Sequence, residues 1–116
     1  MRFMYPGAAA YAEAVDRLAR AAYEGYALAT DVAYGPDPRQ RLDVFAPKNA
    51  PGGSAKRPVV AFIHGGGWVN GDKRWMAFMA ATVTALPAVF VSVGYRLAPG
   101  HRWPAPAHDC RDALAT

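Results

Sequence analysis

Apolar residues recur at helical spacing near the start of the chain. Within residues 8–27, Tyr11, Val15, Leu18 and Ala22 follow one another at intervals of three or four positions, and charged residues occupy the other faces. This spacing places side chains on one side of an α-helix. We therefore expect an amphipathic helix over residues 8–27.

Two short segments with the composition of β-strands come next, at residues 30–34 and 41–46. Between them, residues 35–38 (Gly-Pro-Asp-Pro) combine fixed and permissive backbone angles that suit a chain reversal. The pattern predicts an antiparallel hairpin over residues 30–46. Residues 47–58 are rich in Pro, Gly and Lys and are expected to form an exposed loop.

Two continuous apolar segments, residues 59–63 and 88–93, indicate strands of a different kind. They lack polar alternation, which is typical of parallel strands that are covered on both faces. Residues 73–86 lie between them and have the pattern of a helix. Strand, helix and strand over residues 59–93 predict a βαβ unit with a right-handed crossover.

Flanking residues suggest where the helix of this unit begins and ends. Asp72 is placed to cap its first turn, and Pro87 stops it. One face of the helix is expected to point inward and to contain Trp75, Phe78, Met79, Val83 and Leu86.

The C-terminal part of the chain begins with a Pro-rich loop over residues 95–106. Residues 107–116 then have the pattern of a helix that carries no stop signal. We expect residues 1–116 to form a single, partial α/β domain: an amphipathic helix, an antiparallel hairpin and a βαβ unit of a mostly parallel sheet. The open helix favours a truncated protein over a finished domain.

Composition excludes several classes of protein. The chain is 53% hydrophobic and 19% charged, as expected for a packed globular core. Its 13 Lys and Arg against 9 Asp and Glu are scattered without a reading motif, so no nucleic-acid partner is expected. No apolar run reaches the roughly 18 residues that span a bilayer. Cys110 is the single cysteine, which leaves no disulfide and no metal-ligand spacing, and a cytoplasmic setting is the expectation.

The candidate chemistry lies in His64-Gly65-Gly66-Gly67-Trp68, directly after the apolar strand 59–63. Ligands of open α/β sheets bind at the carboxyl ends of strands. Consecutive glycines leave the backbone N–H groups free to approach a ligand closely. A purely connecting turn is the alternative interpretation, whereas a phosphate-binding loop is excluded because neither G-x-G-x-x-G nor a terminal G-K-S/T is present.

This loop and its surroundings resemble the branch of the α/β-hydrolases that carries a His-Gly-Gly-Gly-Trp motif, which includes hormone-sensitive-lipase-like esterases and arylformamidases. The resemblance extends over residues 41–47, 93–99 and 101–106 and to Asp109, and so from about residue 34 to the end of the chain. Gly100 is a departure, since relatives commonly have Glu at this position.

The resemblance implies a role for each residue of the motif. In that family, the N–H groups of Gly66 and Gly67 hold the oxyanion that forms when an ester carbonyl is attacked. His64, Gly65 and Trp68 support the loop. The implied activity is that of a serine carboxylic ester hydrolase that acts on a small-molecule ester without a metal or organic cofactor. A formamide substrate, as in arylformamidases, and a noncatalytic interaction module are the alternatives.

A nucleophile, an acid and a base are not found in this chain. The family carries its serine on a G-x-S-x-G elbow, followed by the acid and then the histidine. Ser54 lies in the Gly-rich linker and Ser92 lies inside a strand, so both are interpreted as structural. His101 and His108 would precede any elbow, in the reverse of the family's order. The remaining candidates, interpreted as structural, are Asp109, Cys110 and Asp112.

Overall fold

The computed structural model describes residues 6–47 and 56–116. In chain order the elements are α1 (Ala8–Tyr26), β1 (Ala27–Ala33), β2 (Arg41–Phe45), β3 (Val59–Ile63), the 3₁₀ helix η1 (Lys73–Met79), α2 (Ala80–Thr84), β4 (Val89–Val93) and α3 (Ala105–Ala115).

The strands form one mixed sheet in the order β1-β2-β4-β3. β1 pairs with β2 and β2 with β4 in antiparallel fashion, while β3 and β4 are parallel. The predicted hairpin and the predicted βαβ unit are therefore confirmed, and the chain has the α/β architecture expected for it. Residues 48–55, most of the predicted loop, lie outside the described residues, and residues 56–58 have no regular structure.

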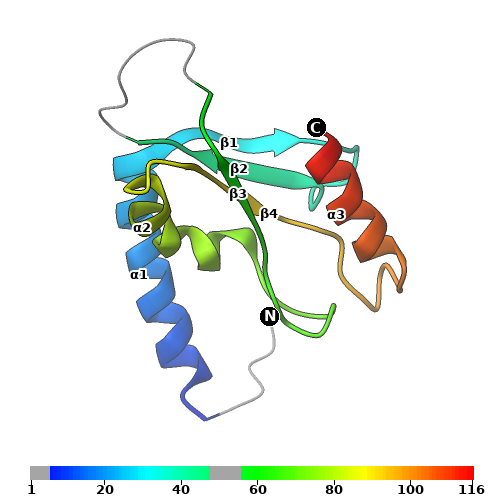
Figure 1. Ribbon diagram of the computed structural model, residues 1–116. Coiled ribbons are helices and arrows are strands. Elements are labelled where there is room, and N and C mark those ends of the chain that lie inside the picture. Colours follow the sequence, from blue (N-terminus) through cyan, green and yellow to red (C-terminus); the bar gives the residue numbers. More distant parts are fainter. Residues whose placement is uncertain (1–5, 48–55) are drawn as a thin grey trace.

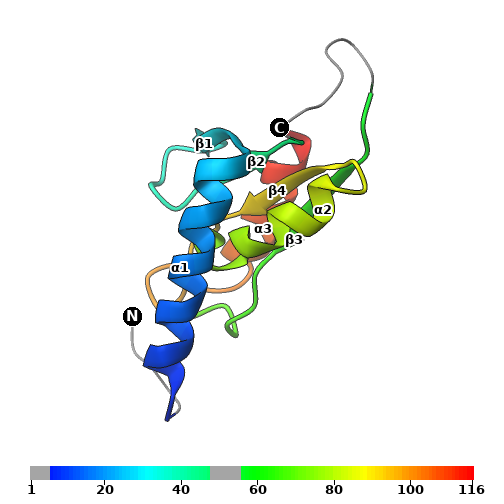
Figure 2. The same ribbon diagram turned by 90° about the vertical axis from the view of Figure 1, so that its left-hand side faces the viewer.

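Helices cover both faces of the sheet (Figures 1 and 2). α1, η1 and α2 lie on one face, where Phe45 of β2 is directly opposite Phe90 of β4. Both rings are fully buried, with centroids 5.8 Å apart. α3 lies on the other face, and its Ala113 packs with Leu42 and Val93. Side chains alternate between the faces along each strand, so one pair of strands supplies both cores.

The crossover between β3 and β4 differs from the predicted helix over residues 73–86. It starts as the 3₁₀ helix η1 and continues as the short α2. The expected inward stripe is wrong at two positions, because Phe78 is 41% and Leu86 71% exposed. The buried residues of the crossover are Ala77 in η1 and Ala80, Val83 and Thr84 in α2, and Leu86 lies beyond the end of α2.

The buried stripe of α1 is also narrower than the spacing predicts. Val15 and Ala22 are buried as expected, whereas Tyr11 is 56% and Leu18 51% exposed. Ala19 takes part instead and is fully buried. Small side chains on this stripe allow α1 to pack closely against η1.

Element boundaries differ from the sequence prediction most clearly at the start of β1 and at the start of α3. α1 ends at Tyr26, and β1 begins at once with Ala27, three residues before the expected strand. α3 begins at Ala105 rather than at residue 107, with a proline in its first turn. Proline is tolerated there because its missing N–H would have no partner within the helix.

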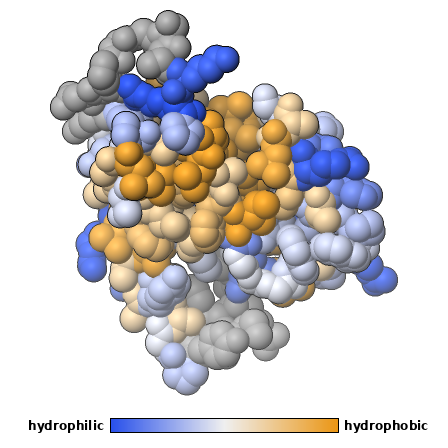
Figure 3. All heavy atoms as spheres, viewed as in Figure 1, coloured by the Kyte–Doolittle hydropathy of each residue, from blue (hydrophilic) through white to orange (hydrophobic). Residues whose placement is uncertain are grey.

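β3 is an edge strand in the described part of the chain, and its apolar side chains are exposed. Val59 is 62% and Ile63 38% exposed, and apolar surface lies across this region in Figure 3. The expected burial on both faces thus holds for β4 but not for β3. None of the described helices is long and apolar enough to cross a membrane.

Candidate functional site

The carboxyl end of β3 runs directly into a loop of unusual backbone conformation, residues 64–71, which we call the glycine loop. Gly66 and Gly67 have φ of 132° and 64°, and Gly71 has 109°. Trp68 also has a positive φ, 65°, which is rare for a bulky residue. Backbone strain of this kind persists only where the surroundings enforce it, and it is frequent at functional sites.

Two of these glycines differ in how much space surrounds them. A Cβ on Gly66 would lie 2.0 Å from the carbonyl oxygen of Asn70, so only glycine fits. A Cβ on Gly67 would meet nothing within 4 Å. Gly66 is therefore required by the packing of the loop, whereas Gly67 is required by its φ alone and borders open space.

The N–H groups of Gly66 and Gly67 point away from the loop's own hydrogen bonds. The carbonyl of Gly65 lies 2.8 Å from Nδ1 of His64, and the carbonyl of Gly66 accepts from the N–H groups of Val69 and Asn70 at 3.3 and 3.1 Å. In a trans peptide the C=O and the following N–H point in opposite directions. Each engaged carbonyl thus directs the N–H of its own peptide away from the partner that binds the carbonyl.

No hydrogen bond in the described part of the chain uses the N–H of Gly66 or of Gly67. Both residues are exposed at the surface. Two neighbouring backbone donors without a protein acceptor form a local concentration of partial positive charge. Such a pair is suited to hold an anionic oxygen.

His64 supports the glycine loop from beneath. It is 4% exposed, and burial lowers the pKa of its imidazole, so that the ring is neutral at neutral pH. A carbonyl oxygen only accepts, so Nδ1 must carry the proton that it shares with the Gly65 carbonyl. Nε2 is buried without a hydrogen-bond partner among the described residues.

Gly71 closes the loop against this histidine. A Cβ on Gly71 would lie 2.2 Å from Nδ1 of His64 and 2.5 Å from the carbonyl oxygen of Gly65, so it would intrude on the hydrogen bond between them. The N–H of Gly71 is bound by the side chain of Asn70 at 3.0 Å. The return of the chain after the glycine loop therefore depends on the absence of a side chain at residue 71.

Trp68 joins the glycine loop to the segment that follows β4. Its carbonyl accepts from the N–H of Ala98 at 2.9 Å, and its ring lies 5.4 Å from that of Tyr95 and 5.2 Å from that of Trp103. Trp68 and Trp103 remain 38% and 61% exposed. The predicted supporting role of Trp68 is consistent with these contacts.

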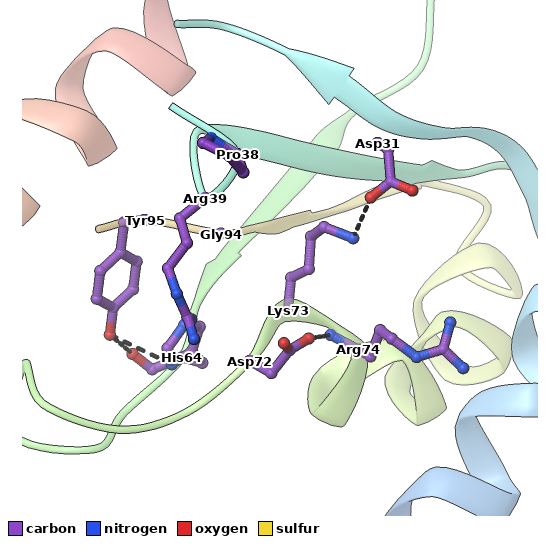
Figure 4. Close-up of a pocket in the computed structure, with 9 residues that line it drawn as sticks. All are labelled: Asp31, Pro38, Arg39, His64, Asp72, Lys73, Arg74, Gly94 and Tyr95. Carbon is purple, nitrogen blue, oxygen red and sulfur yellow. Dashed lines mark hydrogen bonds and ion pairs between the residues drawn. The ribbon is translucent and has the colours of Figure 1, made fainter. Parts of the chain in front are cut away.

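A cavity of about 390 Å³ lies beside His64, at the carboxyl ends of β3 and β4 (Figure 4). Lys73 crosses it and binds Asp31 at 2.8 Å and the fully buried Asp43 at 2.9 Å. Burial alone would lower the pKa of Lys73, but hydrogen bonds to both carboxylates outweigh this and raise it. The Tyr23 hydroxyl also donates to Asp43, so this cluster is saturated and ties α1 to the sheet.

Asp109 is a second buried carboxylate and anchors α3. Arg96 binds it through Nε and Nη2 at 2.9 and 2.7 Å, and Gln40 donates to it at 3.0 Å. Burial would raise the pKa of Asp109, yet these hydrogen bonds hold it below its ordinary value. With both oxygens occupied, Asp109 anchors α3 to the rest of the fold.

The other candidates also have structural surroundings. The hydroxyl of Ser92 is buried and donates to the carbonyl of Lys73 at 2.6 Å, while Ser54 lies outside the described residues. His101 is 3.9 Å from Asp37, and His108 is exposed on α3. Burial raises the pKa of the Cys110 thiol, which keeps it protonated and unreactive. Within residues 6–47 and 56–116, no group of three or more His, Cys, Asp or Glu side chains is placed to hold a metal ion.

The sequence does not predict the part that three further residues play in the site. Tyr95 stacks on His64, Gly71 makes the close approach, and Ala98 binds the carbonyl of Trp68. Only Gly71, which follows Asn70 in a short polar turn, carries a local signal. The other two depend on β4 lying beside β3.

A parallel strand that runs directly into a His-Gly-Gly-Gly loop is found in hydrolases of the α/β class. Residues 60–116 match the family described as having the alpha/beta hydrolase fold. Esterase LipC of Mycobacterium tuberculosis is 40% identical over 85 residues, which cover 72% of this chain and 21% of that protein.

Solved structures give the same result. Esterase B from Lactobacillus rhamnosis superimposes with a TM-score of 0.66 at 27% identity, covering 91% of this chain and 35% of that one. A crystal structure from Silicibacter sp. TM1040 reaches a TM-score of 0.79 over 94% of this chain and 40% of that one, and its 24% identity supports the fold alone. The chain therefore belongs with the α/β-hydrolases, and the relatives that it resembles include esterases. It spans about a fifth of the length of LipC.

Proposed function

We propose that this chain supplies the oxyanion-binding loop of a serine carboxylic ester hydrolase. The observation that carries the proposal is the pair of N–H groups of Gly66 and Gly67, which lack an acceptor in the described part of the chain. When a nucleophile attacks an ester carbonyl, its oxygen becomes a tetrahedral oxyanion. Donors that are fixed in advance around that oxygen lower its free energy without reorganisation during the reaction.

The direction of the two donors supports this role. Hydrogen bonds to the carbonyls of Gly65 and Gly66 already hold the peptide planes that carry them. The space beside Gly67 is open, so an acyl group has room to approach. We expect the oxyanion to lie about 2.7–3.1 Å from both nitrogens.

The nucleophile, the acid and the base are proposed to come from residues beyond these 116, because no G-x-S-x-G elbow occurs among them. In that reaction a serine oxygen attacks the ester carbon while a histidine takes its proton. The histidine then protonates the leaving alcohol, and water releases the acyl group. No step requires a metal or an organic cofactor.

The direct test uses the parent protein, by which we mean the product of the complete reading frame that encodes this chain. We expect saturable hydrolysis of p-nitrophenyl butyrate that is abolished by a serine-directed phosphonate. The 116-residue chain alone should show no saturable hydrolysis, since an oxyanion site without a nucleophile forms no acyl-enzyme. A parent protein that folds and does not hydrolyse short-chain esters contradicts the proposal.

An N-formyl aromatic amide serves as the competing substrate in the same assay. A larger kcat/KM for the formamide than for the ester would favour an arylformamidase-like activity at the same loop. We propose the ester as the better substrate, because the related LipC is an esterase.

The proposed setting of the parent protein is the cytoplasm. The single cysteine, Cys110, is buried and free of a disulfide, which suits a reducing compartment. Localisation of a tagged parent protein tests this expectation, and recovery outside the cell contradicts it.

A further inference from the structure

We infer that Tyr95 is a positioning residue for the proposed reaction: acting through His64, it sets the direction of the Gly66 N–H. The inference rests on the proposed function and extends it to a residue 31 positions away in the chain. Tyr95 would touch neither the substrate nor the oxyanion. Its effect would be transmitted by two successive peptide planes of the glycine loop.

Two contacts join Tyr95 to His64. The rings are stacked with their centroids 4.3 Å apart and an interplanar angle of 13°. The Tyr95 hydroxyl donates to the backbone carbonyl of His64 at 2.5 Å, and the hydroxyl oxygen of Tyr95 also lies 3.3 Å from Nδ1 of the imidazole (Figure 4). Tyr95 is 1% exposed, so water does not compete for these contacts.

The contacts of Tyr95 and His64 fix two consecutive peptide planes, those between His64 and Gly65 and between Gly65 and Gly66. The Tyr95 hydroxyl fixes the His64 carbonyl, and with it the plane between His64 and Gly65. The imidazole, held flat against the Tyr95 ring, fixes the Gly65 carbonyl through Nδ1 at 2.8 Å. Because the peptide is trans, the Gly66 N–H then points away from the imidazole and toward the open side.

The protonation states of the pair suit this arrangement. Burial raises the pKa of Tyr95 to about 12, so the hydroxyl remains a donor at neutral pH. Burial lowers the pKa of His64, so its ring has a single proton, which the accepting carbonyl of Gly65 places on Nδ1. Neither group changes its hydrogen-bonding role over the pH range of an esterase assay near neutrality.

Tyr34 provides a matched control in the same part of the fold. Its hydroxyl also donates to a backbone carbonyl, that of Gly94, and its ring is half-buried. Among the described residues, no hydrogen bond or ring contact joins Tyr34 to the glycine loop, and burial likewise raises the pKa of Tyr34. Tyr34→Phe and Tyr95→Phe therefore each remove one hydroxyl from one backbone carbonyl: Tyr34→Phe from that of Gly94, next to Tyr95, and Tyr95→Phe from that of His64 in the glycine loop.

The experiment compares these two variants in the parent protein. For Tyr95→Phe we expect kcat with p-nitrophenyl butyrate to fall about fivefold to tenfold, as for loss of one hydrogen bond, while KM changes by less than about twofold. Tyr34→Phe should leave kcat unchanged, although both variants should lower the thermal midpoint similarly. In glycine-labelled protein, the NMR order parameters of the Gly65 and Gly66 amides should fall in Tyr95→Phe alone.

Each outcome has one meaning. Unchanged amide order in Tyr95→Phe overturns the inference, whether or not the parent protein hydrolyses esters. Reduced order with unchanged kcat, or an equal loss of kcat in Tyr34→Phe, also overturns it. Absence of ester hydrolysis in the unsubstituted parent contradicts the proposed function instead, and the amide order parameters still report on the link between Tyr95 and the loop.

Discussion

The buried carboxylates and the glycine loop differ in whether their hydrogen-bonding groups have partners within the protein. Asp43 and Asp109 are fully buried, and both oxygens of each have hydrogen-bond partners. Gly66 and Gly67 are exposed and offer two N–H groups that no described acceptor engages. The carboxylates have no oxygen left without a hydrogen-bond partner, whereas the glycine loop leaves two N–H donors available to a ligand.

This difference shows how the chain separates stability from the proposed activity. The carboxylates link distant elements, since Asp109 joins α3 to the start of β2 through Gln40 and to the segment after β4 through Arg96. The glycine loop is held through its carbonyls and through the ring contacts of His64 and Trp68. Substitutions at the two regions should therefore change different measurements.

Breaking a buried carboxylate should produce the largest loss of stability. Asp109→Ala leaves the Arg96 guanidinium and the Gln40 amide without their partner, which typically costs about 3–5 kcal/mol in the free energy of unfolding. Asp112→Ala on the same helix is the control. Its partner Arg111 is 70% exposed, so the expected loss is below about 1 kcal/mol in urea denaturation. Equal losses in the two variants would show that Asp109 is not an anchor.

A side chain at residue 71 should damage both the loop and stability. In Gly71→Ala the new Cβ would lie 2.2 Å from Nδ1 of His64 at a φ of 109°, and we expect a loss of about 2–3 kcal/mol from strain together with reduced kcat. Gly25→Ala in α1 meets nothing within 4 Å and should instead stabilise by about 0.5–1 kcal/mol. A Gly71→Ala variant with normal kcat would contradict the close approach to His64.

The smallest expected effect is a pH dependence of stability from His64. Burial lowers its pKa in the folded protein, so the unfolded chain binds the proton more tightly. Stability is therefore full above the ordinary histidine pKa of about 6.5 and falls as the pH drops below it. His64→Asn retains a donor near the position of Nδ1 and should show a weaker decline between pH 7.5 and 5.5. An identical decline in both proteins would assign the effect to other groups.

The fold was more accessible to sequence reasoning than the support of its site. Hydrophobic periodicity is a local signal, and it correctly placed the hairpin and the strand that runs into His64. The prediction for residues 73–86 is wrong at Phe78, which lies in a 3₁₀ helix with three residues per turn, and at Leu86, which lies beyond the end of α2. Tyr95 was missed since its contact with His64 exists only once β4 pairs with β3.

The central claim is that the free N–H of Gly67 acts on the transition state. Gly67→Ala in the parent protein tests it most directly, and Gly7→Ala is the matched control. Both glycines have a positive φ, 64° and 84°, and a Cβ on either would meet nothing within 4 Å. The two substitutions thus impose similar backbone strain, one in the glycine loop and one before α1.

For Gly67→Ala we expect kcat to fall by about a hundredfold or more, as when one oxyanion donor is lost, with KM nearly unchanged. Gly7→Ala should lose comparable stability and keep its kcat. A Gly67→Ala protein that retains the kcat of the unsubstituted parent, or a Gly7→Ala protein that loses as much, would contradict the account.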